Sequence, residues 1–270
     1  MVERDGVTWT AMIQGYALNG HLDQALKLFQ EMDLEGVVPD EATYSITFTS
    51  ILTACSHAGE VPKGYLTLAK EIHASVLASQ FWQNRYLANL LVEMYGKCGN
   101  LESASSVFAT IDRDVVSWNS VVQGFAQHGQ GRVALELFHE MILNAVAPQT
   151  RTCLSVLLAC GHLGLLERSR EYFLSMQGDH GLAPAVEHYR SMVDGLGRSG
   201  KVAEAESLIQ TMPFLPDSVA WLTLLSACRT HSSGERGAIA AEKAFESDKR
   251  AASQYVLLSS LLNTRPAAKG

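Results

Sequence analysis

The chain has 270 residues, of which 47% are hydrophobic and 18% charged, a composition that is typical of globular proteins and excludes a disordered or collagen-like chain. The 21 lysines and arginines stand against 28 aspartates and glutamates, so the net charge of −7 gives no support to nucleic-acid binding through general charge attraction. Five cysteines without a CxxC pair indicate reduced thiols rather than a disulfide scaffold. No apolar run approaches the ~18 residues that a membrane span requires, and we expect no membrane association.

The sequence repeats itself at two scales. The segment around Trp9 aligns with the segment around Trp118, 109 residues later, and the alignment continues without a gap to Pro39 and Pro148. Shorter segments also recur along the chain. Three of them contain the same Ala-Cys pair: Leu52–His57, Leu157–His162 and Leu225–Cys228. Such periodicity indicates an array of stacked structural units.

Each small unit has the pattern of a helical hairpin. The first predicted helix covers Val7–Tyr16, where apolar residues recur at the i, i+3, i+4, i+7 spacing of an amphipathic helix. Asn19-Gly20 predicts a left-handed turn, after which a second apolar stripe runs over Leu22–Met32. No segment alternates between apolar and polar residues for long, so we expect an all-α fold in which neighbouring hairpins bury each other's apolar faces.

Three motifs of the first unit carry a family resemblance. The segments Val7–Tyr16, Ala25–Met32 and Gly36–Asp40 resemble pentatricopeptide repeats, and the unequal unit lengths resemble the plant PLS subclass. The resemblance implies a right-handed α-α superhelix over residues 1–270, an α-solenoid of helix-turn-helix repeats that is tetratricopeptide-like. The implied repeats are 6–40 (P), 41–84 (L, with insertions), 85–114 (S), 115–149 (P), 150–185 (L), 186–217 (S) and 218–251 (E-like), with a truncated E-like tail at 252–270.

The repeat at 41–84 is longer than its neighbours. Comparison with the other repeats places four extra residues near Ile46–Thr49 and about five near Tyr65–Ala69. Four residues add about one turn and keep the face of a helix, whereas five rotate it by roughly 140°. We therefore predict a bulge or a kinked second helix in this repeat, and a disturbed base-reading register.

The resemblance also implies that particular positions read RNA. One repeat reads one base, through its fifth and its last residue, while the second residue stacks on the base. The implied pairs are Thr10 with Asp40 for guanine, Asn89 with Asp114 for uracil, Thr49 with Asn84 for adenine, and Asn119 with Gln149 for a weak pyrimidine preference. The implied stacking residues are Val7, Tyr86 and Val116, of which Tyr86 offers the strongest platform. Leu154 and Arg190, at later fifth positions, do not fit this pattern.

Simpler roles compete with base reading. Asp40 and Asp114 immediately precede predicted helices, where an aspartate commonly caps backbone N–H groups, and the two roles are compatible. Thr10 and Asn119 also suit exposed polar positions in a first helical turn.

Other prominent residues are predicted to be structural. Trp9 and Trp118 lie on apolar stripes and are predicted core residues. The recurring cysteines are expected to be small buried residues: Cys55, Cys160 and Cys228. Cys55 and His57 are two residues apart and do not face each other on a helix, so we expect no metal site.

No catalytic signature is present. Full-length members of the resembled subclass often end in a zinc deaminase with His-x-Glu and Cys-x-x-Cys signatures, and the sequence has neither, nor a GxxxxGK or GxSxG motif. We therefore expect no enzyme activity from this chain alone and no cofactor.

The sequence as a whole predicts a monomeric single-stranded RNA-binding protein. The resemblance implies a role in a mitochondrion or chloroplast, such as C-to-U editing, with a deaminase or editing cofactor recruited in trans through the E-like region. Met1–Asp5 show no transit-peptide pattern. Two alternatives stay open. A tetratricopeptide-like protein-interaction scaffold agrees with the acidic net charge, and a non-functional fragment of a larger protein agrees with ends that resemble truncated motifs.

Overall fold

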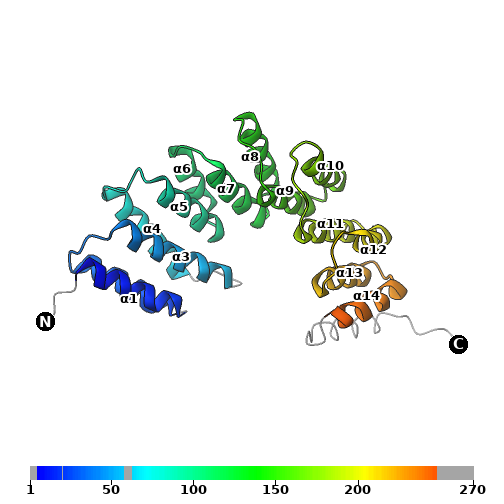
Figure 1. The fold of residues 1–270 in the computed structure, drawn as a ribbon, viewed down its shortest axis with the longest axis horizontal. Coiled ribbons are helices and arrows are strands. Elements are labelled where there is room, and N and C mark those ends of the chain that lie inside the picture. The colour runs from blue at the N-terminus through cyan, green and yellow to red at the C-terminus, as the bar shows by residue number, and fades with distance from the viewer. Residues whose placement is uncertain (1–4, 20, 58–62, 248–270) are drawn as a thin grey trace. The chain divides into compact units, whose positions relative to one another are not determined.

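The computed structural model describes residues 5–19, 21–57 and 63–247, and in these ranges every regular element is an α-helix (Figure 1). The helices are α1 (Gly6–Leu18), α2 (Leu22–Leu34), α3 (Glu41–His57), α4 (Lys63–Ala78), α5 (Arg85–Lys97), α6 (Leu101–Thr110), α7 (Val115–Gln127), α8 (Gly131–Leu143), α9 (Thr150–Leu163), α10 (Leu166–Gly178), α11 (Val186–Arg198), α12 (Val202–Thr211), α13 (Ser218–Thr230) and α14 (Gly234–Ser247). The predicted all-α fold is confirmed. The odd-numbered helices up to α13 begin at the first residues of the repeats drawn from the sequence.

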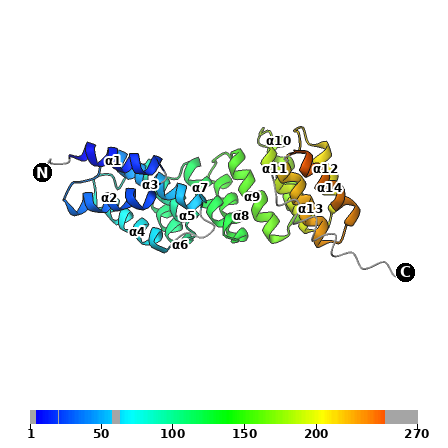
Figure 2. The ribbon, with the colours of Figure 1, turned by 90° about the horizontal axis from the view of Figure 1, so that it is seen from below.

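The helices form two compact units, residues 1–128 with α1–α7 and residues 129–270 with α8–α14. In the first unit α1, α3, α5 and α7 pack against one another in order, and α2, α4 and α6 each pack on the odd-numbered helix before them (Figure 2). In the second unit α9, α11 and α13 form the corresponding row, and α10, α12 and α14 pack against it. Each hairpin therefore buries its apolar stripe against its neighbours, as helical repeats require.

Buried tryptophans anchor the first unit. Trp9 on α1 and Trp118 on α7 are fully buried, which confirms their predicted core role. The Trp118 ring meets Phe108 edge-on with 4.7 Å between ring centroids, and the Arg113 guanidinium lies 5.6 Å from the Trp118 ring centroid. Truncation of such a buried tryptophan to alanine typically costs about 3–5 kcal/mol of stability.

The cysteines that the structure describes at the recurring position are structural. Cys160 and Cys228 are buried, as predicted, and burial raises the pKa of each thiol to about 11. Both thiols are therefore protonated near neutral pH. The side chains of Cys55 and His57 lie outside what the structure describes. Within the described ranges, no three metal-ligating side chains gather into a site, and no helix has the length and apolar character to cross a bilayer.

Two hairpin turns depend on glycine in a left-handed conformation. Gly99, after α5, has φ +74°, and Gly200, after α11, has φ +75°. A Cβ on Gly99 would lie 3.0 Å from the His128 ring, and a Cβ on Gly200 would lie 3.3 Å from the His231 ring. Glycine adopts the left-handed backbone conformation without strain, and its lack of a side chain leaves room for the histidine ring. The turn predicted at Asn19-Gly20 includes Gly20, which lies outside the described residues.

The long repeat at 41–84 accommodates its extra residues as additional helix. Helices α3 and α4 have 17 and 16 residues, whereas α1 and α2 have 13 each. Helix α4 is continuous from Lys63 to Ala78, so of the two predicted alternatives, a bulge or a kinked second helix, the bulge does not occur within this helix. The physical reason is that a longer helix gives each extra residue its backbone hydrogen bond, whereas a bulge leaves a backbone group unpaired.

Helices α5 and α7 approach closely because two glycines face each other. A Cβ added to Gly124 would lie 2.9 Å from the Cα of Gly96. The missing side chains let the two backbones come together near the C-terminal ends of α5 and α7, and closer to their N-terminal ends Asn89 of α5 bonds to Asp114, the residue before α7. This contact positions the residue pair from which the candidate site is built.

Candidate functional site

The fifth residues of the first helices lie in the first helical turn. Thr10 on α1, Asn89 on α5 and Asn119 on α7 each occupy this position. The side chains of Asn89 and Asn119 are 8% and 5% exposed, and Thr10 is partly buried. Asn119 is therefore not the exposed polar residue of the simpler interpretation, because α7 is packed within the unit and its first turn is covered.

Asn89 and Asp114 are directly bonded. The Asn89 amide nitrogen donates to both carboxylate oxygens of Asp114 at 3.1 Å. Asp114 also caps α7, because its Oδ1 accepts hydrogen bonds from the backbone N–H of Val116 and of Ser117. The predicted capping role is confirmed and coexists with the contact to Asn89.

The charge of Asp114 is stabilised by these donors. Burial raises the pKa of the Asp114 carboxyl, but the backbone N–H of Ser117, the Asn89 amide and the backbone N–H of Val116 outweigh burial and hold the pKa below its ordinary value of 3.8. The carboxylate is ionised at neutral pH and acts as a fixed acceptor for the Asn89 amide.

The orientation of the Asn89 amide follows from this pairing. A carboxylate only accepts hydrogen bonds, so the NH₂ group must face Asp114 and the carbonyl oxygen must face away. The buried Oδ1 of Asn89 has no hydrogen-bond partner among the described residues. An unsatisfied buried acceptor costs about 1–3 kcal/mol, and a ligand that supplies an N–H would recover that cost.

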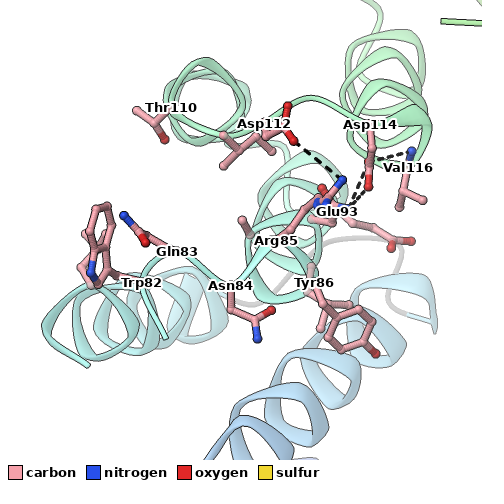
Figure 3. A pocket seen from close by; sticks show the side chains of 15 residues that line it. Trp82, Gln83, Asn84, Arg85, Tyr86, Glu93, Thr110, Asp112, Asp114 and Val116 are labelled. Carbon is pink, nitrogen blue, oxygen red and sulfur yellow. Dashed lines mark hydrogen bonds and ion pairs between the residues drawn. The ribbon is translucent and has the colours of Figure 1, made fainter. Parts of the chain in front are cut away.

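Asn89 and Asp114 line a cavity of about 1170 Å³. Figure 3 shows Asp114 at this cavity together with Asn84, Tyr86 and Val116. Tyr86 and Val116, both predicted stacking residues, lie on its border and are 54% and 47% exposed. Asn84 also lines the cavity and caps α5 by accepting a hydrogen bond from Leu87 N–H. The cavity thus places exposed apolar and aromatic surface beside Asn89, whose unpaired oxygen is itself buried. Such surface suits a flat base.

Tyr86 also borders a second cavity of about 490 Å³, lined in addition by Asp40, Ser45 and Phe81. Ser45 donates a hydrogen bond to the Tyr86 hydroxyl at 3.3 Å and is the fifth residue of α3. Thr49 lies one turn further along α3, donates to the Ser45 carbonyl at 2.8 Å, and lines neither of these two cavities. The structure therefore places Ser45, rather than Thr49, where Thr10 and Asn89 stand in their helices.

Thr10 and Asp40 are linked through a third residue, Thr43. The Thr43 hydroxyl donates to Asp40 Oδ1 at 2.7 Å and lies 2.6 Å from the Thr10 hydroxyl oxygen. The Asp40 carboxylate accepts the Thr43 backbone N–H as well, which confirms its capping role. Hydrogen bonds from the Thr43 side chain and then its backbone lower the pKa of Asp40. Our sequence analysis missed Thr43, although a threonine three residues after a capping aspartate was the available signal.

The predicted residues of the second unit have different surroundings. Gln149 precedes α9, and its backbone N–H donates to the Thr152 hydroxyl at 2.9 Å. Asn119 belongs to the first unit, and Gln149 belongs to the second. Arg190, the fifth residue of α11, pairs with Asp217, which caps α13 through Ala220 N–H.

Family models of pentatricopeptide repeats match most of the chain. The "PPR repeat family" model matches residues 4–57 and 113–162, and the "PPR repeat" model matches residues 86–113 and 187–214. The chain belongs to the pentatricopeptide-repeat family. These matches span both units of the fold.

Similar plant proteins are named after the same repeat. A mitochondrial pentatricopeptide repeat-containing protein of Arabidopsis thaliana is 39% identical over 97% of this chain and 36% of its own length. The chloroplastic protein CRR2 of the same plant is 39% identical over 97% of this chain and 39% of its own length. The pentatricopeptide-repeat chain thus spans about a third of the length of the curated relatives it matches.

Solved structures show the same repeat fold. The pentatricopeptide repeat protein PPR10 in complex with an 18-nt psaJ RNA element has a TM-score of 0.62 at 19% identity, covering 96% of this chain and 43% of its own. A tetratricopeptide repeat protein from Parabacteroides merdae has a TM-score of 0.54 at 15% identity, covering 96% of this chain and 99% of its own. At these identities the likeness shows the fold alone.

Proposed function

We propose that the chain binds single-stranded RNA sequence-specifically, one repeat to one base, and that the Asn89 cavity receives uracil. The observation that carries this proposal is the buried Asn89 Oδ1, an acceptor without a partner in the described part of the chain. Uracil presents the N3–H donor that this oxygen lacks, whereas N3 of cytosine is an acceptor and would repel it. Tyr86 and Val116 supply the flanking stacking surface.

The other predicted positions extend the proposal. Thr10 with Asp40 is assigned to guanine, with Thr43 orienting the Thr10 hydroxyl, and Asn119 with Gln149 to a weak pyrimidine preference. In the long repeat at 41–84, Asn84 remains assigned to adenine. We assign Ser45 rather than Thr49 as its partner, because Ser45 is the fifth residue of α3.

The cellular role is also part of the proposal. We assign the chain to RNA processing in a mitochondrion or chloroplast, specifically to recognition of C-to-U editing sites by a PLS-type array. The names of the mitochondrial and chloroplastic relatives support the organelle, and the complex of PPR10 with RNA supports the ligand class. In this role α13 and α14, within the E-like region, recruit a deaminase or editing cofactor in trans, and the chain itself recognises RNA without catalysis.

Selection from a randomised single-stranded RNA pool, at low and at physiological salt, tests the proposal. We expect the wild-type chain to enrich a uracil at one fixed position, and Asn89→Ala to lose that enrichment with about tenfold weaker binding, because about 1–3 kcal/mol of base discrimination disappears.

Asn100→Ala is the matched control. Asn100 caps α6 through Ser103 N–H and lines neither cavity of the first unit, so its replacement removes an asparagine cap without changing the cavity. We expect its RNA selection to equal that of the wild type. Absence of any enriched base, or loss of all binding at physiological salt, would instead support a tetratricopeptide-like protein scaffold.

A further inference from the structure

The repeat at 186–217 has the same architecture as the repeat at 85–114 but opposite hydrogen-bonding chemistry. Arg190 is the fifth residue of α11, as Asn89 is of α5, and Asp217 precedes α13 as Asp114 precedes α7. Both aspartates cap the following helix and both bind the fifth residue. The two repeats thus share the capping aspartate and differ at the fifth residue, where an arginine stands in place of an asparagine.

The Arg190–Asp217 contact is a two-point, side-on pair. Arg190 Nε donates to Asp217 Oδ1 at 3.3 Å, and Arg190 Nη2 donates to Oδ2. Asp217 Oδ1 also accepts the Ala220 backbone N–H at 3.1 Å, so the carboxylate is held from two sides. Because the guanidinium is planar, two parallel bonds to a fixed carboxylate also fix the direction of its remaining N–H groups.

The outer edge of Arg190 remains available. A guanidinium carries five N–H donors, and the side-on pair uses one on Nε and one on Nη2. In the described ranges, Nη1 makes no hydrogen bond or ion pair. The side chain is 29% exposed, so Arg190 is accessible in part while most of the side chain is shielded from water. Nη1 and Nη2 thus present two parallel donors at the position where the Asn89 site presents an acceptor.

We propose that Arg190, oriented by Asp217, selects guanine in the repeat at 186–217. This inference rests on the proposed RNA-binding function. Guanine presents two adjacent acceptors, O6 and N7, on its Hoogsteen edge, with the spacing of an arginine fork. On that edge adenine places an amino donor, which meets the arginine donors, and uracil offers a single acceptor. Cytosine presents O2 and N3 as adjacent acceptors on its Watson–Crick edge, so enrichment of cytosine in place of guanine would overturn the inference. A phosphate group also matches the fork, and it is the rival ligand that the experiment must separate.

The test is selection from the randomised single-stranded RNA pool with the full chain and its Arg190→Asn variant. The repeats at 115–149 and 150–185 lie between the two sites, so the wild type should enrich a uracil and a guanine separated by two nucleotides. Arg190→Asn recreates the Asn–Asp pair of the first unit. It should therefore replace that guanine by uracil, weaken binding of the guanine-containing RNA about tenfold, and leave the Asn89-dependent uracil unchanged.

Two further variants keep the result interpretable. Arg170→Asn removes the same charge from α10, where Arg170 pairs with Glu167 and Glu204, and should leave both enriched bases in place. Arg190→Lys keeps the charge beside Asp217 but has no planar fork, so guanine enrichment should fall while the circular dichroism spectrum stays that of the wild type. If Arg190→Asn does not fold, the guanine enrichment of Arg190→Lys tests the proposal in its place.

The outcomes separate the two proposals. A uracil opposite Asn89 without a guanine separated from it by two nucleotides overturns the Arg190 inference alone. Equal weakening of all RNA sequences by Arg190→Asn shows a phosphate contact and also overturns it. Absence of any base preference in the wild type overturns the proposed function and the inference together.

Discussion

At the scale of single residues, the fifth residue of a first helix sets which hydrogen-bonding groups stand beside the capping aspartate. Asp114 and Asp217 perform the same two tasks, capping a helix and holding the fifth residue of the preceding first helix. Asn89 then leaves a buried oxygen without a partner, whereas Arg190 leaves N–H groups unpaired in the described part of the chain. In the proposed function, the aspartate would orient the fifth residue, and the fifth residue would determine which base fits.

The charge of Asp114 leads to a prediction about the stability of the fold at acidic pH. Because its folded-state pKa lies below the ordinary 3.8, the stabilisation is complete above that value and is lost as the pH falls through the folded-state pKa. Asp114→Ala should lower the free energy of unfolding by about 1 kcal/mol at pH 7, as loss of an N-cap does, and the difference from wild type should shrink towards pH 3. Urea unfolding at both pH values measures it.

Asp112 provides the control for this experiment. Its carboxylate is highly exposed and lies 3.8 Å from Arg85, so Asp112→Ala should change stability by less than about 0.5 kcal/mol. If the effect of Asp114→Ala is as large at pH 3 as at pH 7, then the charge of the carboxylate is not its source.

At the scale of helices, the spacing between α5 and α7 depends on a pair of glycines. Gly124→Ala would place a Cβ 2.9 Å from the Gly96 Cα, and backbone cannot rotate away as a side chain can. Overpacking costs about 1–3 kcal/mol, which exceeds the gain of up to about 1 kcal/mol in helix propensity. We therefore expect net destabilisation and, because Asn89 and Asp114 bridge the same two helices, weaker selection of uracil.

Gly161 is the control for the Gly124→Ala substitution, because an added Cβ has open space around it. It lies within α9, and a Cβ there would meet nothing within 4 Å. Gly161→Ala should raise stability by about 0.5–1 kcal/mol in thermal or urea unfolding. Equal effects at both glycines would contradict the role of the close approach.

Helix boundaries were predictable from the sequence, whereas the register inside the long repeat was not. Apolar periodicity and capping residues mark where each hairpin begins, since both are local signals. An insertion inside a helix carries no such mark, because the lengthened α3 keeps its hydrogen bonding and its start at Glu41. Alignment alone therefore selected Thr49, while the helix itself places Ser45 at the fifth position. The bridging Thr43 and the Arg190–Asp217 pair depend on contacts between neighbouring helices, which periodicity does not encode.

At the scale of the whole molecule, the charge distribution predicts how RNA binding responds to salt. The net charge is −7, and many basic side chains already pair with carboxylates, among them Arg85, Lys97, Arg198 and Arg236. Because the net charge is acidic and these cations are already paired, the slope of log K against log salt concentration should be shallower than about −2, equivalent to fewer than about three phosphate contacts. Fluorescence anisotropy at several salt concentrations measures this slope, and a slope steeper than about −4 would show that backbone contacts dominate.

Tyr86 couples two neighbouring cavities, which recognition of each base by an independent repeat would not do. Its side chain borders both the Asn89 cavity and the smaller cavity beside Ser45, so two consecutive nucleotides would share one wall. Any shift of the ring that accommodates one occupant changes the space and the hydroxyl contact offered to the other. If the proposed function holds, affinities for neighbouring nucleotides at this point would not be additive, and the preferred base at the second position would depend on the base at the first.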